Sequence, residues 1–147
     1  MEIINGERLV LGTCYYPEHW DESLWRDDLR RMLENGIEVI RIAEFAWSKI
    51  ERYEGVFNYD FFDRFLDLAE EMGMKVIFCT PTATPPAWLT EKYPEVLNAN
   101  MDGVLYRHGA RRHYNYNSPK YQELTRIIVE KSASHYAKHP AIIGWQI

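Results

Sequence analysis

The sequence is poor in features that mark several large classes of protein. Its 147 residues include only two cysteines, Cys14 and Cys79, whose spacing fits neither a metal cluster nor a disulfide-rich scaffold. No stretch approaches the roughly 18 consecutive apolar residues that a membrane-spanning helix requires. Residues 1–12 also lack the apolar run of a secretory signal. These absences favour a protein of the reducing cytoplasm with free thiols and no membrane partner.

Clusters of positive charge and glycine-rich loops are also missing. Lysine and arginine are scattered and the formal net charge is −5, so the basic stripe typical of nucleic-acid-binding proteins is absent. No glycine-rich phosphate loop follows the first apolar run, which argues against a dinucleotide-binding fold. Aromatic residues, by contrast, make up 14% of the chain, with five Trp and ten Tyr. They can fill a core, but they also line clefts that bind ligands.

Short apolar runs alternate with segments that have the spacing of helices. The runs are nearly continuous, as in parallel strands covered on both faces, and lie at residues 9–14, 39–43, 75–79 and 141–147. The predicted helices cover residues 21–35, 61–72 and 118–138. Residues suited to helix ends flank them, namely Asp21 and Ser118 at two starts and Gly36 and Gly73 after two ends. The pattern predicts right-handed βαβ units in a single domain over residues 1–147.

Connections of unequal length point to one architecture. Segments that follow the predicted strands are long, at residues 15–20, 44–59 and 80–117, whereas those that follow the helices are short. This asymmetry is typical of a (β/α)8 TIM barrel, whose site lies at the carboxyl ends of the strands. We therefore expect an α/β fold, the N-terminal half of a TIM barrel with four parallel strands and three helices. A doubly wound sheet is the alternative that the pattern leaves open.

Polar and aromatic side chains gather just after the predicted strands. They include Tyr16, Glu18, His19, Trp20, Glu44, Trp47, Trp88, Arg111 and Arg112, while Arg41 lies inside the second strand. A sugar needs such a lining, with aromatic faces for its C–H surface and charged groups for its hydroxyls. The alternatives are that the tryptophans cap the core, that Arg41 forms a structural ion pair and that the glutamates are solvated. His19 and His113 have no further ligands at metal-binding spacing, so they predict no metal site.

Five motifs carry a resemblance to a known family. They are YYPEHW at residues 15–20, RIAEFAWS at 41–48, TPTATPPAWL at 80–89, RRHY at 111–114 and GWQI at 144–147. In this order, over nearly the whole chain, they resemble the family 42 β-galactosidases. The resemblance implies retaining hydrolysis of terminal β-D-galactosides by double displacement, with two glutamates as nucleophile and acid/base. It also implies that both glutamates lie beyond Ile147, so that no catalytic residue falls within these residues and the chain alone is inactive.

The same resemblance implies roles in substrate binding. Arg111 is the first choice for the galactose contact and Arg112 the second, while Arg41 corresponds to an arginine that keeps the nucleophile ionised. With Trp47 and Trp88 these residues form the predicted substrate-binding set. Many members bind zinc through cysteines, the first of which directly follows the tyrosine of the RRHY motif. Asn115 occupies that position here, so we expect no zinc and no other cofactor.

Two other functions remain open from the sequence. A barrel glycosidase could act on a different β-linked sugar, and a non-catalytic half-barrel could bind carbohydrate or a partner chain. Four strands do not close a barrel of about 250 residues, so the first and fourth strands would have unpaired edges. We therefore expect the chain alone to be poorly stable or to self-associate as a homo-oligomer.

Overall fold

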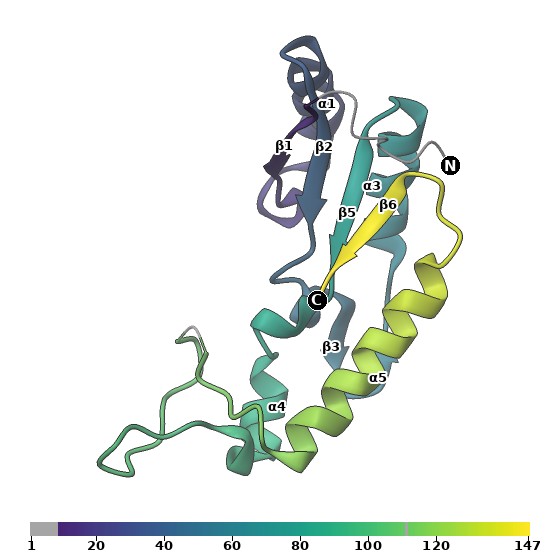
Figure 1. The fold of residues 1–147 in the computed structure, drawn as a ribbon. Helices are drawn as coiled ribbons and strands as arrows, with labels where there is room; N and C mark the ends of the chain where they lie inside the picture. The colour runs from purple at the N-terminus through teal and green to yellow at the C-terminus, as the bar shows by residue number, and fades with distance from the viewer. Residues whose placement is uncertain (1–8, 111) are drawn as a thin grey trace. The chain divides into compact units, whose positions relative to one another are not determined.

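The computed structural model describes residues 9–110 and 112–147, and a parallel sheet is its main feature (Figure 1). Its four strands lie in the order β1-β2-β5-β6, and each neighbouring pair is parallel. The strands are β1 (Leu11–Cys14), β2 (Ile37–Ile42), β5 (Lys75–Cys79) and β6 (Ile142–Gln146). All four fall within two residues of the predicted runs, which confirms the predicted parallel strands.

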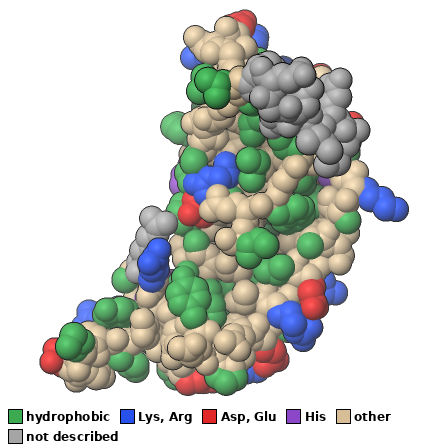
Figure 2. All heavy atoms as spheres, viewed as in Figure 1, with side chains coloured by type: hydrophobic (Ala, Val, Ile, Leu, Met, Phe, Trp, Pro, Cys, Tyr) green, Lys and Arg blue, Asp and Glu red, His purple; other side chains and the backbone are tan. Residues whose placement is uncertain are grey.

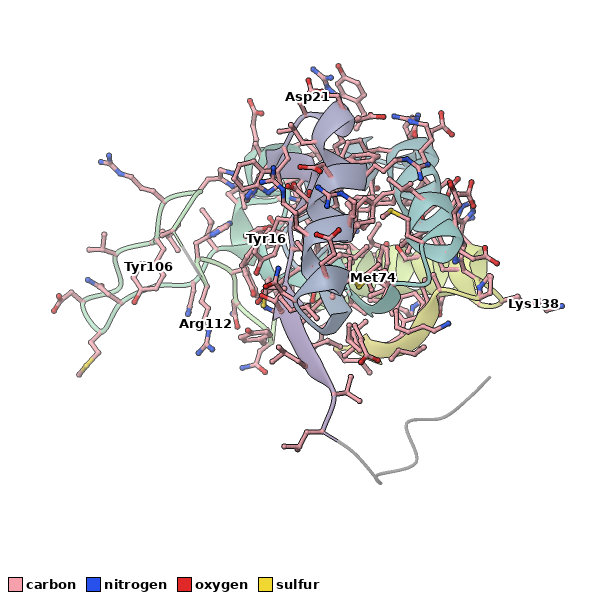
Figure 3. All side chains as sticks on the ribbon, turned by 90° about the horizontal axis from the view of Figure 1, so that it is seen from above. Tyr16, Asp21, Met74, Tyr106, Arg112 and Lys138 are labelled. Carbon is pink, nitrogen blue, oxygen red and sulfur yellow. The ribbon has the colours of Figure 1, made fainter. Side chains whose placement is uncertain are left out.

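Three long helices alternate with these strands, as predicted. They are α1 (Trp25–Glu34), α3 (Asp60–Glu71) and α5 (Pro119–Tyr136). Asp21 (Figure 3) accepts a hydrogen bond from the backbone N–H of Ser23 at 2.9 Å and opens a 3-10 turn, Glu22–Leu24, that leads into α1. Gly36 and Gly73 follow α1 and α3 with φ of 78° and 77°, a conformation that favours glycine. The predicted ends of the first two helices are therefore confirmed, whereas α1 itself begins at Trp25, four residues after the predicted start.

The described residues divide into two compact units. The first contains the sheet, α1 and α3, and covers residues 9–43, Tyr59–Cys79 and Tyr136–Ile147. Its core is aromatic: the Phe62 ring on α3 meets Phe78 on β5 edge to face at 5.8 Å, and Phe65 stacks on Tyr15 at 5.7 Å. These four side chains are almost completely buried, so the helix layer is fixed on one face of the sheet.

The second unit covers Glu44–Asn58 and Thr80–His135, the segments predicted only as long loops together with most of α5. It contains two short helices and a hairpin that were not predicted: α2 (Trp47–Ile50), α4 (Ala87–Lys92), β3 (Glu51–Tyr53) and β4 (Val56–Phe57). The sequence did not predict the 3-10 turns either, which are Pro81–Ala83 and Pro94–Val96 in this unit and Pro17–His19 in the first unit. Elements of two to six residues are too short to show a clear hydrophobic period, which is why the sequence did not indicate them.

The outer strands of the main sheet are β1 and β6. All four residues of β1 are exposed, and among the described strands each of these two has a pairing partner on one side only. No helix in the described part of the chain is long and apolar enough to cross a membrane. The single domain over residues 1–147 stays a prediction, since the described residues divide into two compact units.

Candidate functional site

Arg41 lies near the carboxyl end of β2, where the parallel register brings residues of the two neighbouring strands and of β6 around it. Its Nε and Nη2 donate to Cys14 Sγ on β1 at 3.3 and 3.0 Å. On the other side, Nη1 donates to Gln146 Oε1 on β6 at 2.8 Å and to Cys79 Sγ on β5 at 3.7 Å. Nη2 also reaches the hydroxyl of Tyr16 at 3.4 Å. We name Arg41 with these four neighbours the arginine cluster.

The arginine cluster holds a permanent cation in a fixed place. Guanidinium has five N–H donors and stays protonated, so several acceptors at once are needed to orient it. A fixed cation at this end of a parallel sheet attracts anions and lowers the pKa of a nearby carboxylic acid. That chemistry suits the predicted role beside a nucleophilic carboxylate, which stays a prediction.

A second cluster, built around Glu51 at the start of β3, contains both predicted tryptophans. The Trp47 Nε1 donates to Glu51 Oε2 at 2.7 Å, and the backbone N–H of Gly55 donates to Oε1 at 2.8 Å. The Trp88 Nε1 donates to the backbone carbonyl of Glu51 at 3.0 Å. Burial raises the pKa of the Glu51 carboxyl, and the hydrogen bonds from Gly55 and Trp47 partly oppose that shift. We name these four residues the glutamate cluster.

The two tryptophans differ in how far solvent reaches them. Trp47 is completely buried, which agrees with the alternative that it caps the core. Trp88, in the first turn of α4, is half-buried. Contact of either residue with a sugar stays a prediction. Sequence reasoning missed Glu51 because its segment was expected to be a loop; a tryptophan four residues before it and a glycine four residues after it were the only signal.

In the RRHY motif, the last two residues, His113 and Tyr114, are buried. Arg111 lies outside the described residues. Arg112 is exposed, with a φ of 61°, and lies near the segment that carries Tyr106 (Figure 3). The His113 ring donates from Nδ1 to the Ala110 carbonyl, and the Tyr114 ring stacks on Tyr121 at 4.6 Å. The buried pair fixes the backbone that presents Arg112 at the surface.

The carboxamide of Asn115 takes part in a turn. Asn115 Oδ1 accepts from the backbone N–H of Asn117 at 2.9 Å, so this carboxamide closes a turn. A carboxamide is a poor zinc ligand, and both cysteines accept hydrogen bonds from Arg41.

Within residues 9–110 and 112–147, one group of three potential metal ligands occurs elsewhere, formed by Asp67, Glu70 and His139. The backbone N–H of Ala141 donates to His139 Nδ1 at 3.3 Å, so the ring proton lies on Nε2, which faces Asp67 at 3.6 Å. Asp67 and Glu70 are exposed, and 3.6 Å is an ion-pair contact rather than a hydrogen bond, so nothing beyond the proximity of the three side chains indicates a metal site.

The parallel sheet, with polar and aromatic side chains at its carboxyl edge, is typical of barrel hydrolases. The family model described as β-galactosidase, glycoside hydrolase family 42, matches residues 14–147. The chain belongs to glycoside hydrolase family 42.

Curated relatives and solved structures agree with this assignment. The β-galactosidase Bga of Halorubrum lacusprofundi is 43% identical over 136 residues, which are 92% of this chain and 19% of that protein. The β-galactosidase BgaA of a Thermus species is 44% identical over 137 residues, 93% of this chain and 21% of the relative. The crystal structure of the β-galactosidase from the psychrophilic Marinomonas ef1 superposes with a TM-score of 0.90 at 43% identity, covering 94% of this chain and 21% of that one. The chain therefore spans about a fifth of the length of these relatives, and its predicted fold class, the N-terminal half of a TIM barrel, is confirmed.

Proposed function

We propose that these residues form the first part of the catalytic barrel of a β-galactosidase that releases terminal β-D-galactose by the retaining, double-displacement route. Family membership over residues 14–147 is the observation that carries the proposal. In that reaction one glutamate attacks the anomeric carbon while a second protonates the leaving oxygen; water then releases the sugar. Both glutamates are expected beyond Ile147, and the chain alone is expected to be inactive.

The residues described here would bind and orient rather than attack. Arg41, fixed by the arginine cluster, would keep the nucleophile ionised through its positive charge. Arg111 and Arg112 would hold sugar hydroxyls, since guanidinium presents several N–H donors in one plane. Trp88 would offer an aromatic face to the C–H surface of the sugar.

Rates on chromogenic β-galactosides and β-glucosides, measured with the complete enzyme, test the substrate. We expect faster turnover of the galactoside; equal or faster turnover of the glucoside would favour a barrel glycosidase for another sugar. Residues 1–147 expressed alone should give no turnover. Turnover by that shorter chain would contradict the placement of both glutamates beyond Ile147, whereas sugar binding by a complete enzyme without turnover would favour a non-catalytic carbohydrate-binding protein.

We also propose that the segment around Asn115 binds no zinc. The turn made by its carboxamide and the location of both cysteines in the arginine cluster support this. Residues 1–147, incubated with zinc and desalted, should retain only substoichiometric metal. Stoichiometric zinc that is lost in an Asn115→Ala variant would contradict the proposal.

Self-association through the sheet edges is proposed for residues 1–147 in isolation. The exposed β1 strand, including Leu11 at 57% exposure, supports it, because an open edge offers unpaired backbone groups to another chain. Sedimentation at micromolar concentration should show oligomers or an unfolded chain. A well-folded monomer would contradict this expectation.

For partners and compartment, we propose a β-galactoside substrate, no nucleic acid and a cytoplasmic location. On the face drawn in Figure 2, basic side chains stand in separate small groups among acidic ones, without the continuous stripe that nucleic-acid binding needs. Both cysteines are free thiols, which suits a reducing compartment. Cell fractionation with an antibody to the complete enzyme tests the location.

A further inference from the structure

Glu51 receives three N–H groups that come from separate points of the second unit. Trp47 Nε1 and the Gly55 backbone donate to its two carboxylate oxygens, at 2.7 and 2.8 Å. Trp88 Nε1 donates to its backbone carbonyl at 3.0 Å. Only 3% of Glu51 is exposed. One residue therefore sets the directions of two indole rings and of the β3–β4 turn, where Gly55 has a φ of 78°.

Burying a carboxylate carries a large desolvation penalty, whereas an apolar side chain would fill the same space without it. An apolar residue would, however, leave the N–H groups of Trp47 and Gly55 unpaired. It would also leave the rotation of the Trp47 ring to packing alone. What the carboxylate adds is direction, because hydrogen bonds fix the orientation of a ring more narrowly than van der Waals contact does.

The glutamate cluster joins two segments that are far apart in the sequence. Trp47 and Glu51 follow β2, whereas Trp88 follows β5, 37 residues after Glu51. In parallel-sheet barrels, such segments build the substrate site. A bond that ties them together controls where the half-buried Trp88 ring lies.

We propose that Glu51 is a positioning residue for substrate binding, which holds the indole of Trp88 and the two segments that carry the cluster in the orientation that receives the sugar. This inference rests on the proposed function, because Trp88 is its predicted sugar contact. Glu51 acts through its neighbours and touches no substrate itself.

Steady-state kinetics of the complete enzyme with Glu51→Gln test this role. Both carboxylate oxygens accept hydrogen bonds, so an amide of the same shape turns its NH2 group toward an existing donor. We expect KM for an aryl β-galactoside to rise about tenfold, the size of one lost hydrogen bond, while kcat changes less than about twofold. Unchanged KM together with a lower melting temperature would show a purely structural role and overturn the proposal.

Trp88→Phe provides a second route to the same answer, since it keeps an aromatic face but loses the N–H that bonds to Glu51. We expect a similar rise in KM, and in the double variant an effect smaller than the product of the two single effects, because the carboxylate of Glu51 holds in place the backbone carbonyl to which Trp88 bonds. If Glu51→Gln does not fold, Trp88→Phe decides alone: an unchanged KM overturns the proposal. Independent, multiplying effects of the two changes would also overturn it.

Glu54→Gln is the matched control on the same hairpin. Glu54 accepts from Tyr93 at 2.7 Å and pairs with Lys92, but it lies near the surface and bonds to neither tryptophan. Its KM should match that of the wild type within about twofold, as is usual for surface substitutions. If the enzyme prefers a glucoside, the proposed β-galactosidase function fails. The role of Glu51 is still tested in that case, by comparing KM for the glucoside between the wild type, Glu51→Gln and Glu54→Gln.

Discussion

The two units of the chain each hold one charged side chain among neutral partners, and they do so in opposite ways. In the arginine cluster a half-buried cation donates to two thiols, an amide oxygen and a phenol at the carboxyl end of the sheet. In the glutamate cluster a buried anion accepts from an indole and a backbone N–H. A cation oriented at a strand end can act on an incoming carboxylate or ligand. A buried anion that accepts hydrogen bonds from its neighbours acts by holding them in place, so we expect Arg41 to act directly on the reaction and Glu51 to act through the positions of its neighbours.

The largest effect on stability should come from removing Trp47. Its side chain is completely buried, so Trp47→Ala leaves a large cavity and an unpaired carboxylate oxygen on Glu51. We expect a loss of about 4 kcal/mol in the free energy of unfolding, measured by urea denaturation with circular dichroism. Trp20→Ala is the matched control in the first unit, because Trp20 is 54% exposed, and it should cost less than about 1 kcal/mol. Equal losses in the two variants would contradict the buried role of Trp47.

Arg41→Met should have the next largest effect, and on activity rather than stability. Methionine keeps much of the length of the side chain but removes the positive charge. If Arg41 keeps the nucleophile ionised, kcat/KM should fall about a hundredfold, or about 2.7 kcal/mol. The acid limb of the pH profile should also move to higher pH, because without a neighbouring cation the pKa of the nucleophile rises. A hundredfold loss with an unmoved acid limb would assign Arg41 to substrate binding instead.

Glu51 and Glu54, on one hairpin, should give pH dependences of opposite sign. Burial raises the pKa of Glu51, so the native state holds its proton more tightly, and stability falls as pH rises from the ordinary value to the raised one. Hydrogen bonds from Lys92 and Tyr93 lower the pKa of Glu54, so its contribution is present above the ordinary pKa and is lost as pH falls through the lowered one.

Melting temperatures between about pH 3 and pH 7 check both signs. Glu51→Gln should remove the decline toward neutral pH. Glu54→Gln should remove a smaller rise, which high salt also weakens because Glu54 is partly exposed. If both substitutions changed the pH dependence of the melting temperature in the same direction, the opposite pKa shifts of Glu51 and Glu54 would be contradicted.

The first unit could be predicted from the sequence far better than the second. Its strands are continuous apolar runs, and Gly36 and Gly73 mark the helix ends by a backbone conformation that other residues avoid. Arg41 stood out because a charge inside an apolar strand needs partners. Its acceptors Cys14 and Cys79 could not be foreseen, since they lie 27 and 38 residues away and meet Arg41 only through the sheet register.

In the second unit the hydrogen bonds of the glutamate cluster are not accompanied by any hydrophobic periodicity from which the sequence could predict them. The β3–β4 hairpin has strands of three and two residues, and the carboxylate of Glu51 accepts a hydrogen bond from the backbone N–H of Gly55 in its turn. Trp47 and Trp88 were predicted as part of a sugar-binding rim from their place after two strands. That they share one hydrogen-bonding partner is a tertiary contact that the sequence does not contain.

The smallest effect should come from the surface ion pair between α1 and α3 in the first unit. Arg26 and Glu71 form two parallel hydrogen bonds, at 2.9 and 2.8 Å, a geometry as good as any in the glutamate cluster. Both side chains are about 60% exposed, so water and salt compete for each partner. Arg26→Ala should therefore leave the melting temperature within measurement error, at low and at high salt alike. A clear loss at low salt that disappears at high salt would show that this pair holds α1 against α3. In that case an exposed hydrogen-bonded pair would stabilise the fold as the buried ones do, and burial alone would not predict which hydrogen bonds contribute to stability.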